Sequence, residues 1–358
     1  MPAHARVTIK EIARMTGVST QTVSRVINKR PDVAPATRAA VEAAIAEVGF
    51  HPSAVARSLV QRRSNMIGVL AAGLRYFGVA QTLNGISEQV ESAGYSIILK
   101  ELAAFEVPDI VPVIESLVAH RVEGIIFASP QLELNVRHAQ EQLPPSCPPI
   151  VFLKAEPSSD FTTIGIDNRD GGRQATEHLI RLGRRRIGHL AGPLEWMEAR
   201  DRRDGWIEAL EVAGLARGPL ACGNWSSESG VRAFAEILEV DPTIDGLFVA
   251  NDQMALGALH VAFRRGIRIP DDLAVVGFDG LPEAAEFNPS LTTIRQPLRE
   301  LGKLAVDELI ARIEERPGRG AGSALTLPTE LIVRDSAPWP MQPGSTPVLA
   351  TGSGTPAP

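Results

Sequence analysis

Apolar residues recur at helical spacing near the start of the chain, in two short runs separated by a glycine. The segment 8–28, TIKEIARMTGVSTQTVSRVIN, opens with Thr8 and Glu11 in the T-x-x-E pattern of a capping box, which predicts a helix start. Gly17 ends this helix, and Ser19 can cap a second one. The predicted buried stripes are Ile9, Ile12 and Ala13 on the first helix and Val23, Val26 and Ile27 on the second. Two short helices on so tight a turn are typical of a helix-turn-helix unit.

The polar face of the second helix has the chemistry of DNA recognition. The residues that point away from its apolar stripe are Thr20, Gln21, Ser24 and Arg25. Gln21 matches the adenine edge with two hydrogen bonds, Arg25 matches guanine, and Thr20 can bond a base or touch a thymine methyl. This face therefore suits readout in the major groove. A plain solvated helix hairpin is the alternative, and the agreement of cap, turn, stripe and polar face disfavours it.

A third helix and a short connecting helix are predicted next. Pro35 sits where the third helix begins and Gly49 ends it, and its buried face comprises Val41, Ile45 and Val48. Segment 51–64, HPSAVARSLVQRRS, can form a helix over 54–60, which is too short to be stable alone. We expect this segment to order only against DNA or a partner copy, which makes it a candidate switch.

From Met66 onward apolar strands alternate with amphipathic helices. The expected strands are 66–71, 95–100, 124–129, 149–154, 162–167, 186–192, 246–252, 273–280 and 291–297. Continuous apolar strands separated by helices predict doubly wound α/β structure with parallel sheets covered on both faces. This is too many strands for one compact sheet, so the pattern predicts two similar lobes with a ligand cleft between them.

The predicted organisation has four parts. They are a DNA-binding head, 1–50; a hinge helix and linker, 51–64; an effector-binding and dimerisation core, 65–336; and a disordered tail, 337–358, rich in Pro, Gly, Ser and Thr. Within the core, the expected lobes are 65–164 with 296–325, and 165–295 with 326–336. The tail has no leucine heptads, so it offers no coiled-coil route to higher assembly.

Charge is divided unevenly along the chain. Residues 1–63 hold ten Lys or Arg and four acids, a net charge of +6, whereas the whole chain is formally −6, which leaves −12 for the remainder. Affinity for a polyanion depends on this local basic footprint rather than on the total. Phosphate contacts there predict DNA binding that weakens steeply with salt.

Several classes of protein are disfavoured by composition and motif. The only cysteines, Cys147 and Cys222, fit a reducing cytosol, and no His/Cys cluster has metal-ligand spacing. The N-terminus has no apolar signal region and no run approaches a membrane span, so we expect a cytoplasmic protein. No hydrolase elbow, phosphate-binding loop, zinc-protease or dinucleotide motif is found, so we expect no catalysis, no cofactor and no metal.

Several segments in order resemble the lactose-repressor (LacI/GalR) family of bacterial transcription regulators, over essentially all of 7–335. They are VSTQTVSRVIN, LAGPLEWMEARDRRDGW, GNWSSESG, VANDQMALGAL, VVGFDG and LTTIRQP, and several are most similar to the family's namesake. The resemblance implies a repressor whose all-α head is joined to a two-lobed, periplasmic-binding-protein-like sensor. It also implies a homodimer on a pseudo-palindromic operator, with a small effector setting DNA affinity.

The resemblance also assigns DNA-contacting positions. Thr20, Gln21 and Arg25 fall on base-reading positions, and Leu59 falls on the hinge leucine that wedges into the minor groove and kinks the duplex. For Leu59 a plain packing role is the alternative. The full expected set is Thr8, Ser19, Thr20, Gln21, Thr22, Ser24, Arg25, Asn28, Ala56 and Leu59.

Polar residues that follow strand ends predict the effector site, because ligands of doubly wound sheets bind beyond the carboxyl ends of the strands. Asn251 and Asp252 end one predicted strand, Asp279 ends another, and Arg202 follows a third by a loop. Carboxylate, carboxamide and guanidinium groups suit vicinal hydroxyls, and Trp225 offers a flat face for a pyranose. Each has a plainer alternative in a turn, a helix cap, a surface charge or the core, and the joint match to the family's effector contacts decides between them.

On the other lobe, Tyr76 and Phe77 lie in a glycine-flanked loop that can close over a ligand, and Gln296 resembles a family contact. Two positions depart from the family namesake: Lys154 replaces an acid, and Ala128 takes the place of an asparagine. Lys154 either pairs with a neighbouring acid, Glu156 or Asp160, or favours an acidic or differently substituted sugar. The expected effector residues are Tyr76, Lys154, Arg202, Trp225, Asn251, Asp279 and Gln296.

These observations predict a regulator whose effector is a sugar or glycoside, with a β-galactoside as the first candidate. Both lobes are expected to grip the effector and rotate, which separates the paired hinge helices and uncouples the heads from DNA. A transport-type sugar-binding protein is the rival, but it should carry a signal peptide and no DNA head, and this chain shows the reverse.

Overall fold

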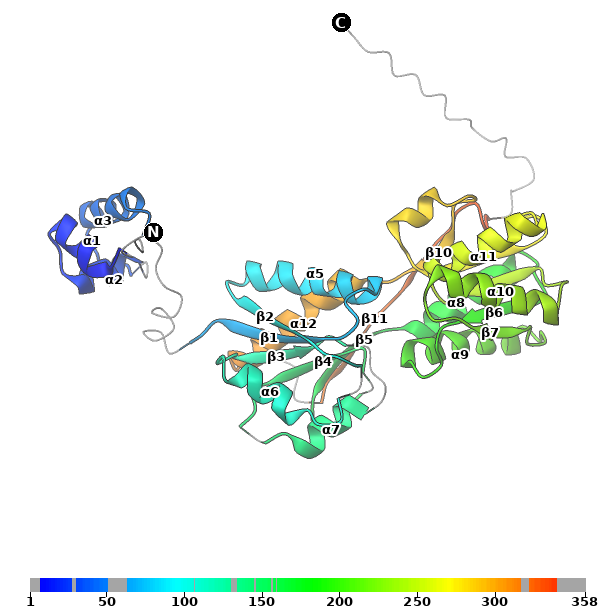
Figure 1. The fold of residues 1–358 in the computed structure, drawn as a ribbon, viewed down its shortest axis with the longest axis horizontal. Helices are drawn as coiled ribbons and strands as arrows, with labels where there is room; N and C mark the ends of the chain where they lie inside the picture. Colours follow the sequence, from blue (N-terminus) through cyan, green and yellow to red (C-terminus); the bar gives the residue numbers. More distant parts are fainter. Residues whose placement is uncertain are drawn as a thin grey trace, which may run out of the picture. The chain divides into compact units, whose positions relative to one another are not determined.

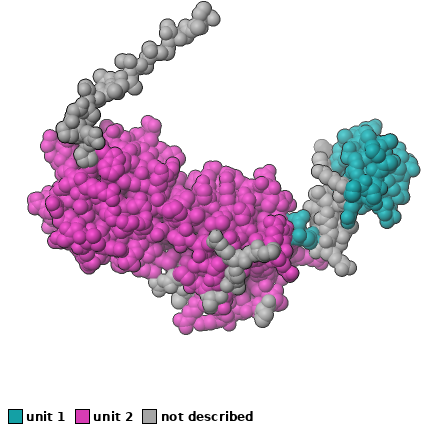
Figure 2. All heavy atoms as spheres, turned by 180° about the vertical axis from the view of Figure 1, so that it is seen from behind, with its two compact units in different colours: residues 1–65 teal, residues 66–358 magenta. Residues whose placement is uncertain are grey.

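The computed structural model describes residues 7–27, 30–50, 63–105, 107–129, 134–144, 146–155, 157–158, 160–316 and 322–339. The chain divides into two compact units, Met1–Asn65 and Met66–Pro358 (Figure 2). The predicted hinge helix, with Ala56 and Leu59, lies outside the described residues, as does Asn28. Among the described helices, none is both long and apolar enough to cross a membrane.

The first unit is a three-helix head built on the predicted apolar stripes. Its helices are α1 (Ile9–Thr16), α2 (Thr20–Ile27) and α3 (Pro35–Glu47). Ile12, Val23 and Val41, one from each helix, are completely buried at the centre of its core. Gly17 has a φ of 68°, a left-handed conformation that costs glycine nothing and permits the tight turn between α1 and α2.

The two predicted caps of the head have different outcomes. The Ser19 hydroxyl accepts a hydrogen bond from the amide of Thr22 at 3.1 Å, so the cap of α2 is confirmed. The capping box at Thr8 is wrong in its side-chain part, because Thr8 occupies the cap position of α1 without a side-chain cap bond. Its backbone carbonyl instead accepts from the amides of Glu11 and Ile12, and this backbone turn starts the helix.

The first lobe of the second unit contains a fully parallel sheet in the order β11-β5-β4-β3-β1-β2. Its strands are β1 (Met66–Ala71), β2 (Ser96–Glu101), β3 (Gly124–Phe127), β4 (Ile150–Leu153), β5 (Thr162–Ile166) and β11 (Ala324–Leu327). Helices α5 (Phe77–Ser92) and α12 (Leu298–Ile313) cover one face, and α6 (Val111–Val118) and α7 (Leu134–Gln142) cover the other (Figure 1). Alternate residues of β1 supply both cores: Val69 packs on the α5 and α12 side, and Leu70 on the α6 side.

The second lobe repeats this plan in the order β12-β10-β9-β8-β6-β7. Its strands are β6 (Ile187–Ala191), β7 (Leu220–Cys222), β8 (Gly246–Val249), β9 (Ala274–Asp279), β10 (Thr292–Arg295) and β12 (Glu330–Ile332). Its helices are α8 (Asn168–Arg181), α9 (Met197–Val212), α10 (Ser227–Val240), α11 (Asp252–Arg265) and the 3-10 helix η1 (Pro282–Glu286). Helices α8 and α9 pack together, as do α10 and α11, and each pair borders a separate core.

The chain passes between the lobes three times, after β5, after β10 and after β11. Each crossing is short, because helix α8 follows β5 at Asn168, α12 follows β10 at Leu298, and β12 follows β11 at Glu330. Three short crossings side by side can act as a hinge between two otherwise independent cores.

Three strands were missed by the sequence pattern. They are β7, β11 and β12, which lie at sheet edges and have three or four residues each with partly exposed side chains. Short half-exposed edge strands carry no continuous apolar run, which is the signal used for the others. The pair β10–β12 is also antiparallel, in a sheet otherwise parallel.

The boundary of the predicted disordered tail is wrong by at least its first residues. Ala337 is completely buried, and its carbonyl accepts a hydrogen bond from Nε2 of His178 at 2.7 Å. Trp339 packs edge-on against the same imidazole, with ring centroids 4.6 Å apart. Packing against α8 therefore orders a segment whose composition alone suggested disorder. Cys147 and Cys222 are both free thiols.

Candidate functional site

The head presents the predicted recognition residues on one helix. Thr20, Gln21 and Arg25 are exposed on α2, opposite its buried Val23 and Val26. Ser24 and Thr22 are partly buried, and the hydroxyl of Thr22 lies 2.9 Å from that of Ser19, so Thr22 helps to hold the start of the helix. The exposed face therefore has the donors and acceptors that readout of base edges requires.

Arg25 is already paired within the head. Its guanidinium lies 3.5 Å from the carboxylate of Asp32, and the two side chains are 48% and 56% exposed. An ion pair this exposed contributes little to stability and is screened by salt. A guanine edge can therefore replace Asp32 at small cost, so this contact leaves Arg25 available for readout.

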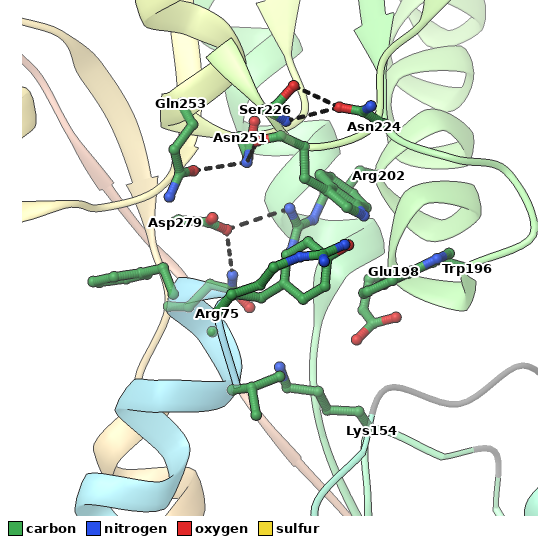
Figure 3. A pocket seen from close by; sticks show the side chains of 16 residues that line it. Arg75, Lys154, Trp196, Glu198, Arg202, Asn224, Ser226, Asn251, Gln253 and Asp279 are labelled. Carbon is green, nitrogen blue, oxygen red and sulfur yellow. Dashed lines mark hydrogen bonds and ion pairs between the residues drawn. The ribbon is translucent and has the colours of Figure 1, made fainter. Parts of the chain in front are cut away.

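A cavity of about 410 Å³ lies in the second unit and is lined from both lobes (Figure 3). It lies beyond the carboxyl ends of β1, β6, β7 and β8, where helices α5, α9, α10 and α11 begin. The cavity brings together all the residues predicted for the effector site: Tyr76, Lys154, Arg202, Trp225, Asn251, Asp279 and Gln296. Phe77 also lines it, whereas Ala128 packs in the core of the first lobe.

A buried ion pair, Arg202 with Asp279, lies at the centre of the second-lobe wall. Arg202 donates to the carbonyl of Ala250 at 2.5 Å and to the Asn168 side chain at 2.9 Å, and its closest approach to Asp279 is 3.4 Å. Asp279 also accepts from the Gln296 amide at 2.6 Å. Burial raises the pKa of the Asp279 carboxyl, and the Arg202 charge opposes that rise. The surface-charge alternative for Arg202 is wrong, since the residue is 4% exposed.

Asn251 and Asp252 have structural tasks as well as a place near the cavity. The Asn251 side chain caps α11 by accepting from the amide of Met254, and it donates to the carbonyl of Trp225 at 3.0 Å. Asp252 is completely buried behind the cavity wall and accepts hydrogen bonds from Thr293 and from the amide of Leu281. Burial, reinforced by the charge of the nearby Asp279, raises the pKa of Asp252 to about 8.

Lys154 lies on the first-lobe wall of the cavity. It follows β4 with a φ of 54°, and its ammonium lies over Gly78 in the first turn of α5. Burial lowers the pKa of Lys154, and the carboxylate of Glu198 opposes this most strongly. Among the described residues Lys154 forms no ion pair with Asp160, which accepts a hydrogen bond from Gln140, and Glu156 lies outside them.

Aromatic side chains from both lobes pack across the cavity. The Trp196 ring lies 5.4 Å from that of Tyr76, 4.7 Å from that of Phe105 and 5.6 Å from that of Trp225. Trp225 is therefore both core and cavity wall, with 9% of its surface exposed. The indole nitrogen of Trp225 is buried without a hydrogen-bond partner among the described residues.

Sequence reasoning missed part of the lining. The missed residues are Arg75, Gly78, Val79, Trp196, Glu198, Asn224, Ser226 and Gln253. Trp196 and Glu198 lie at the start of α9, directly after β6, so the rule that located Asn251 also applies to them. Gln253 follows the end of β8 in the same way, whereas Asn224 and Ser226 follow β7, a strand that the sequence pattern did not predict. Gly78 and Val79 belong to the first turn of α5 and carry no comparable signal.

Fold and site together define a class: a basic helix-turn-helix head joined to a two-lobed α/β ligand-binding body. Comparisons with known proteins agree with this class. The profile described as "Bacterial regulatory proteins, lacI family" matches residues 8–53, and that of a "Periplasmic binding protein-like domain" matches residues 176–337.

Full-length relatives extend the agreement. The chain is 33% identical to the lactose operon repressor of Escherichia coli (strain K12), over 92% of this chain and 90% of that protein. It is also 33% identical to the ribose operon repressor of Halalkalibacterium halodurans, over 92% and 96%. A crystal structure of the lac repressor dimer bound to operator and the anti-inducer ONPF superposes with a TM-score of 0.83, at 32% identity, over 93% of this chain and 99% of that one. The chain belongs to the lacI family of bacterial regulatory proteins.

Proposed function

We propose that this protein is a homodimeric transcriptional repressor whose affinity for a pseudo-palindromic operator is set by a neutral or charged sugar or glycoside bound between the lobes. The observation that carries the proposal is the convergence of seven predicted effector residues on one cavity lined from both lobes. The two relatives are named for lactose and ribose operons at equal identity, so identity does not select the effector. A β-galactoside is the first candidate to test.

The geometry supports a mechanism through lobe rotation. Effector groups that contact Arg202 and Asp279 on one lobe and Lys154 on the other favour the arrangement in which all three contacts are made. Three short crossings allow the lobes to turn about the hinge without unfolding either core. Rotation then alters the spacing of the two first lobes in the dimer, and through the segment 51–64 the spacing of the heads.

The proposal is tested with the full-length dimer. Selection from a library of randomised inverted-repeat duplexes yields the operator, and fluorescence anisotropy at fixed salt then measures affinity with each member of a panel of mono- and disaccharides. We expect preference for one inverted repeat over its scrambled version and a change in affinity of about tenfold or more with at least one sugar. No preference for any duplex, or no response to any sugar, contradicts the proposal.

A further inference from the structure

Two opposite charges face each other across the cavity from different lobes. Lys154 follows β4 in the first lobe, and Glu198 lies in the first turn of α9 in the second. Figure 3 shows the two side chains extending toward the same space, and no hydrogen bond or ion pair joins them among the described residues. The space between them is therefore where a ligand group would meet both charges.

Glu198 is the less satisfied of the two. Only 5% of its surface is exposed, and its Oε2 atom is buried without a hydrogen-bond partner among the described residues. The start of α9 partly offsets its charge, because negative groups are favoured at a helix N-terminus. A buried carboxylate oxygen without a donor is costly, so a ligand that donates a hydrogen bond there gains affinity.

Lys154 requires a ligand atom that accepts a hydrogen bond, whereas Glu198 requires one that donates a hydrogen bond. The Lys154 ammonium lies over Gly78 in the first turn of α5, where the amides of Val79 and Ala80 already donate to the Tyr76 carbonyl. An ammonium group only donates hydrogen bonds, so a ligand group that contacts it must present an acceptor. A hydroxyl group donates to Glu198 and accepts from Lys154 at the same time, whereas a carboxylate accepts from Lys154 and is repelled by Glu198.

The charges that line the cavity also favour a neutral ligand. The charged lining residues are Arg75, Lys154, Glu198, Arg202 and Asp279. Arg75 is exposed and donates to the Tyr76 hydroxyl, and the four remaining charged residues, which are buried or half-buried, are two cations and two carboxylates. An interior that sums to zero does not favour a charged ligand over its neutral counterpart.

We propose that Lys154 and Glu198 are specificity-determining residues that share a hydroxyl of a neutral carbohydrate and reject acidic sugars. The inference deepens the proposed function and rests on it. A lysine considered without Glu198 suggests either a pair with a neighbouring acid, Glu156 or Asp160, or an acidic or differently substituted sugar. The Glu198 carboxylate repels the carboxylate of an acidic sugar and so excludes such a sugar.

The test measures binding of matched neutral and acidic sugars to the full-length dimer by calorimetry. The probes are galactose with galacturonate and glucose with glucuronate, in which a carboxylate replaces the C6 hydroxymethyl group and the ring is kept. We expect at least one neutral sugar to bind about tenfold or more tighter than its acidic counterpart. If no neutral sugar binds, or if an acidic sugar binds tighter, the inference is overturned.

Variants assign that preference to the two residues. Glu198→Gln keeps the shape and removes the repulsion, so the neutral-to-acidic preference should fall about tenfold, while Lys154→Met should raise it and weaken neutral binding about tenfold. The matched control is the exposed pair Arg217 with Glu211, away from the cavity, where Glu211→Gln and Arg217→Met should change neither affinity. An unchanged preference in both cavity variants overturns the inference.

Failure of the inference is distinguishable from failure of the proposed function. An acidic sugar that binds best and changes operator affinity removes the role of Glu198 and keeps the sugar-responsive repressor. Absence of any effect of neutral and acidic sugars on both binding and operator affinity removes both.

Discussion

The residues predicted to be functional in the DNA-binding head and in the cavity of the body lie in opposite environments. Gln21 and Arg25 are exposed on a helix whose stability depends on other residues, whereas Arg202 and Asp279 are buried and hold one another. The predicted recognition residues of the head can therefore be changed with little effect on its folding, whereas the predicted effector residues of the cavity also stabilise the body. A substitution in the cavity therefore changes ligand binding and the stability of the body together, so both must be measured for each variant.

The largest effect is expected from Arg202→Ala. The change leaves the Asp279 charge buried with one partner fewer, which should destabilise the body by about 3–5 kcal/mol and abolish the sugar response. Operator affinity should remain, because the head is a separate unit. Thermal unfolding and anisotropy titration check both statements. Arg203→Ala, which removes a partly exposed cation outside the cavity, should cost less than about 1 kcal/mol, and a normal sugar response in Arg202→Ala removes Arg202 from the site.

Asp252 should make the stability of the body depend on pH. Its pKa is about 8 in the folded protein against a model-peptide value of 3.8, so between these values the folded state binds more protons than the unfolded state. Stability relative to Asp252→Asn should therefore fall as pH rises through this window, by at most about 1.4 kcal/mol per pH unit. Denaturant unfolding of both proteins at pH 5, 6 and 7 measures the difference. A difference that stays constant or grows with pH shows that Asp252 is charged in the folded state.

Arg25→Ala should weaken operator binding by about 1–3 kcal/mol and relax sequence preference at one base pair. The expected change in stability is below about 0.5 kcal/mol, because the side chain is half exposed. Competition between the selected operator and single-base variants gives the readout. Arg14→Ala, an exposed cation on α1, is the control and should leave base preference unchanged. Equal loss on every duplex would place Arg25 on the phosphate backbone instead.

The smallest effects concern the two caps of the head. Ser19→Ala removes the hydroxyl that accepts from the Thr22 amide and should destabilise α2 by about 1 kcal/mol. Thr8→Ala removes a side chain that makes no cap bond, so the stability of α1 should change by less than about 0.5 kcal/mol. Native-state hydrogen exchange of the full chain separates the two helices. Equal loss of protection in both variants would restore the capping box.

Hydrophobic periodicity predicted most of the fold, and the polar residues that follow strand ends helped to predict half of the cavity lining. Continuous apolar runs located β1, β6, β8 and β9 because buried parallel strands need them on both faces. The sequence pattern did not predict strand β7 or the packing of Trp339, because edge pairing and packing on α8 depend on tertiary contacts rather than on local pattern. The same holds for Glu198, whose meaning comes from facing Lys154 across the cavity, a juxtaposition that chain order alone does not show.

The central claim is that the cavity and the DNA-binding face are coupled, and linkage between two binding equilibria tests it most directly. Affinity of the full-length dimer for the best-binding neutral sugar should be measured with and without saturating operator duplex, and affinity for operator with and without saturating sugar. The account predicts that both ratios equal the same factor, of about tenfold or more, and that a scrambled duplex leaves sugar affinity unchanged. A sugar affinity that is identical with and without operator contradicts it.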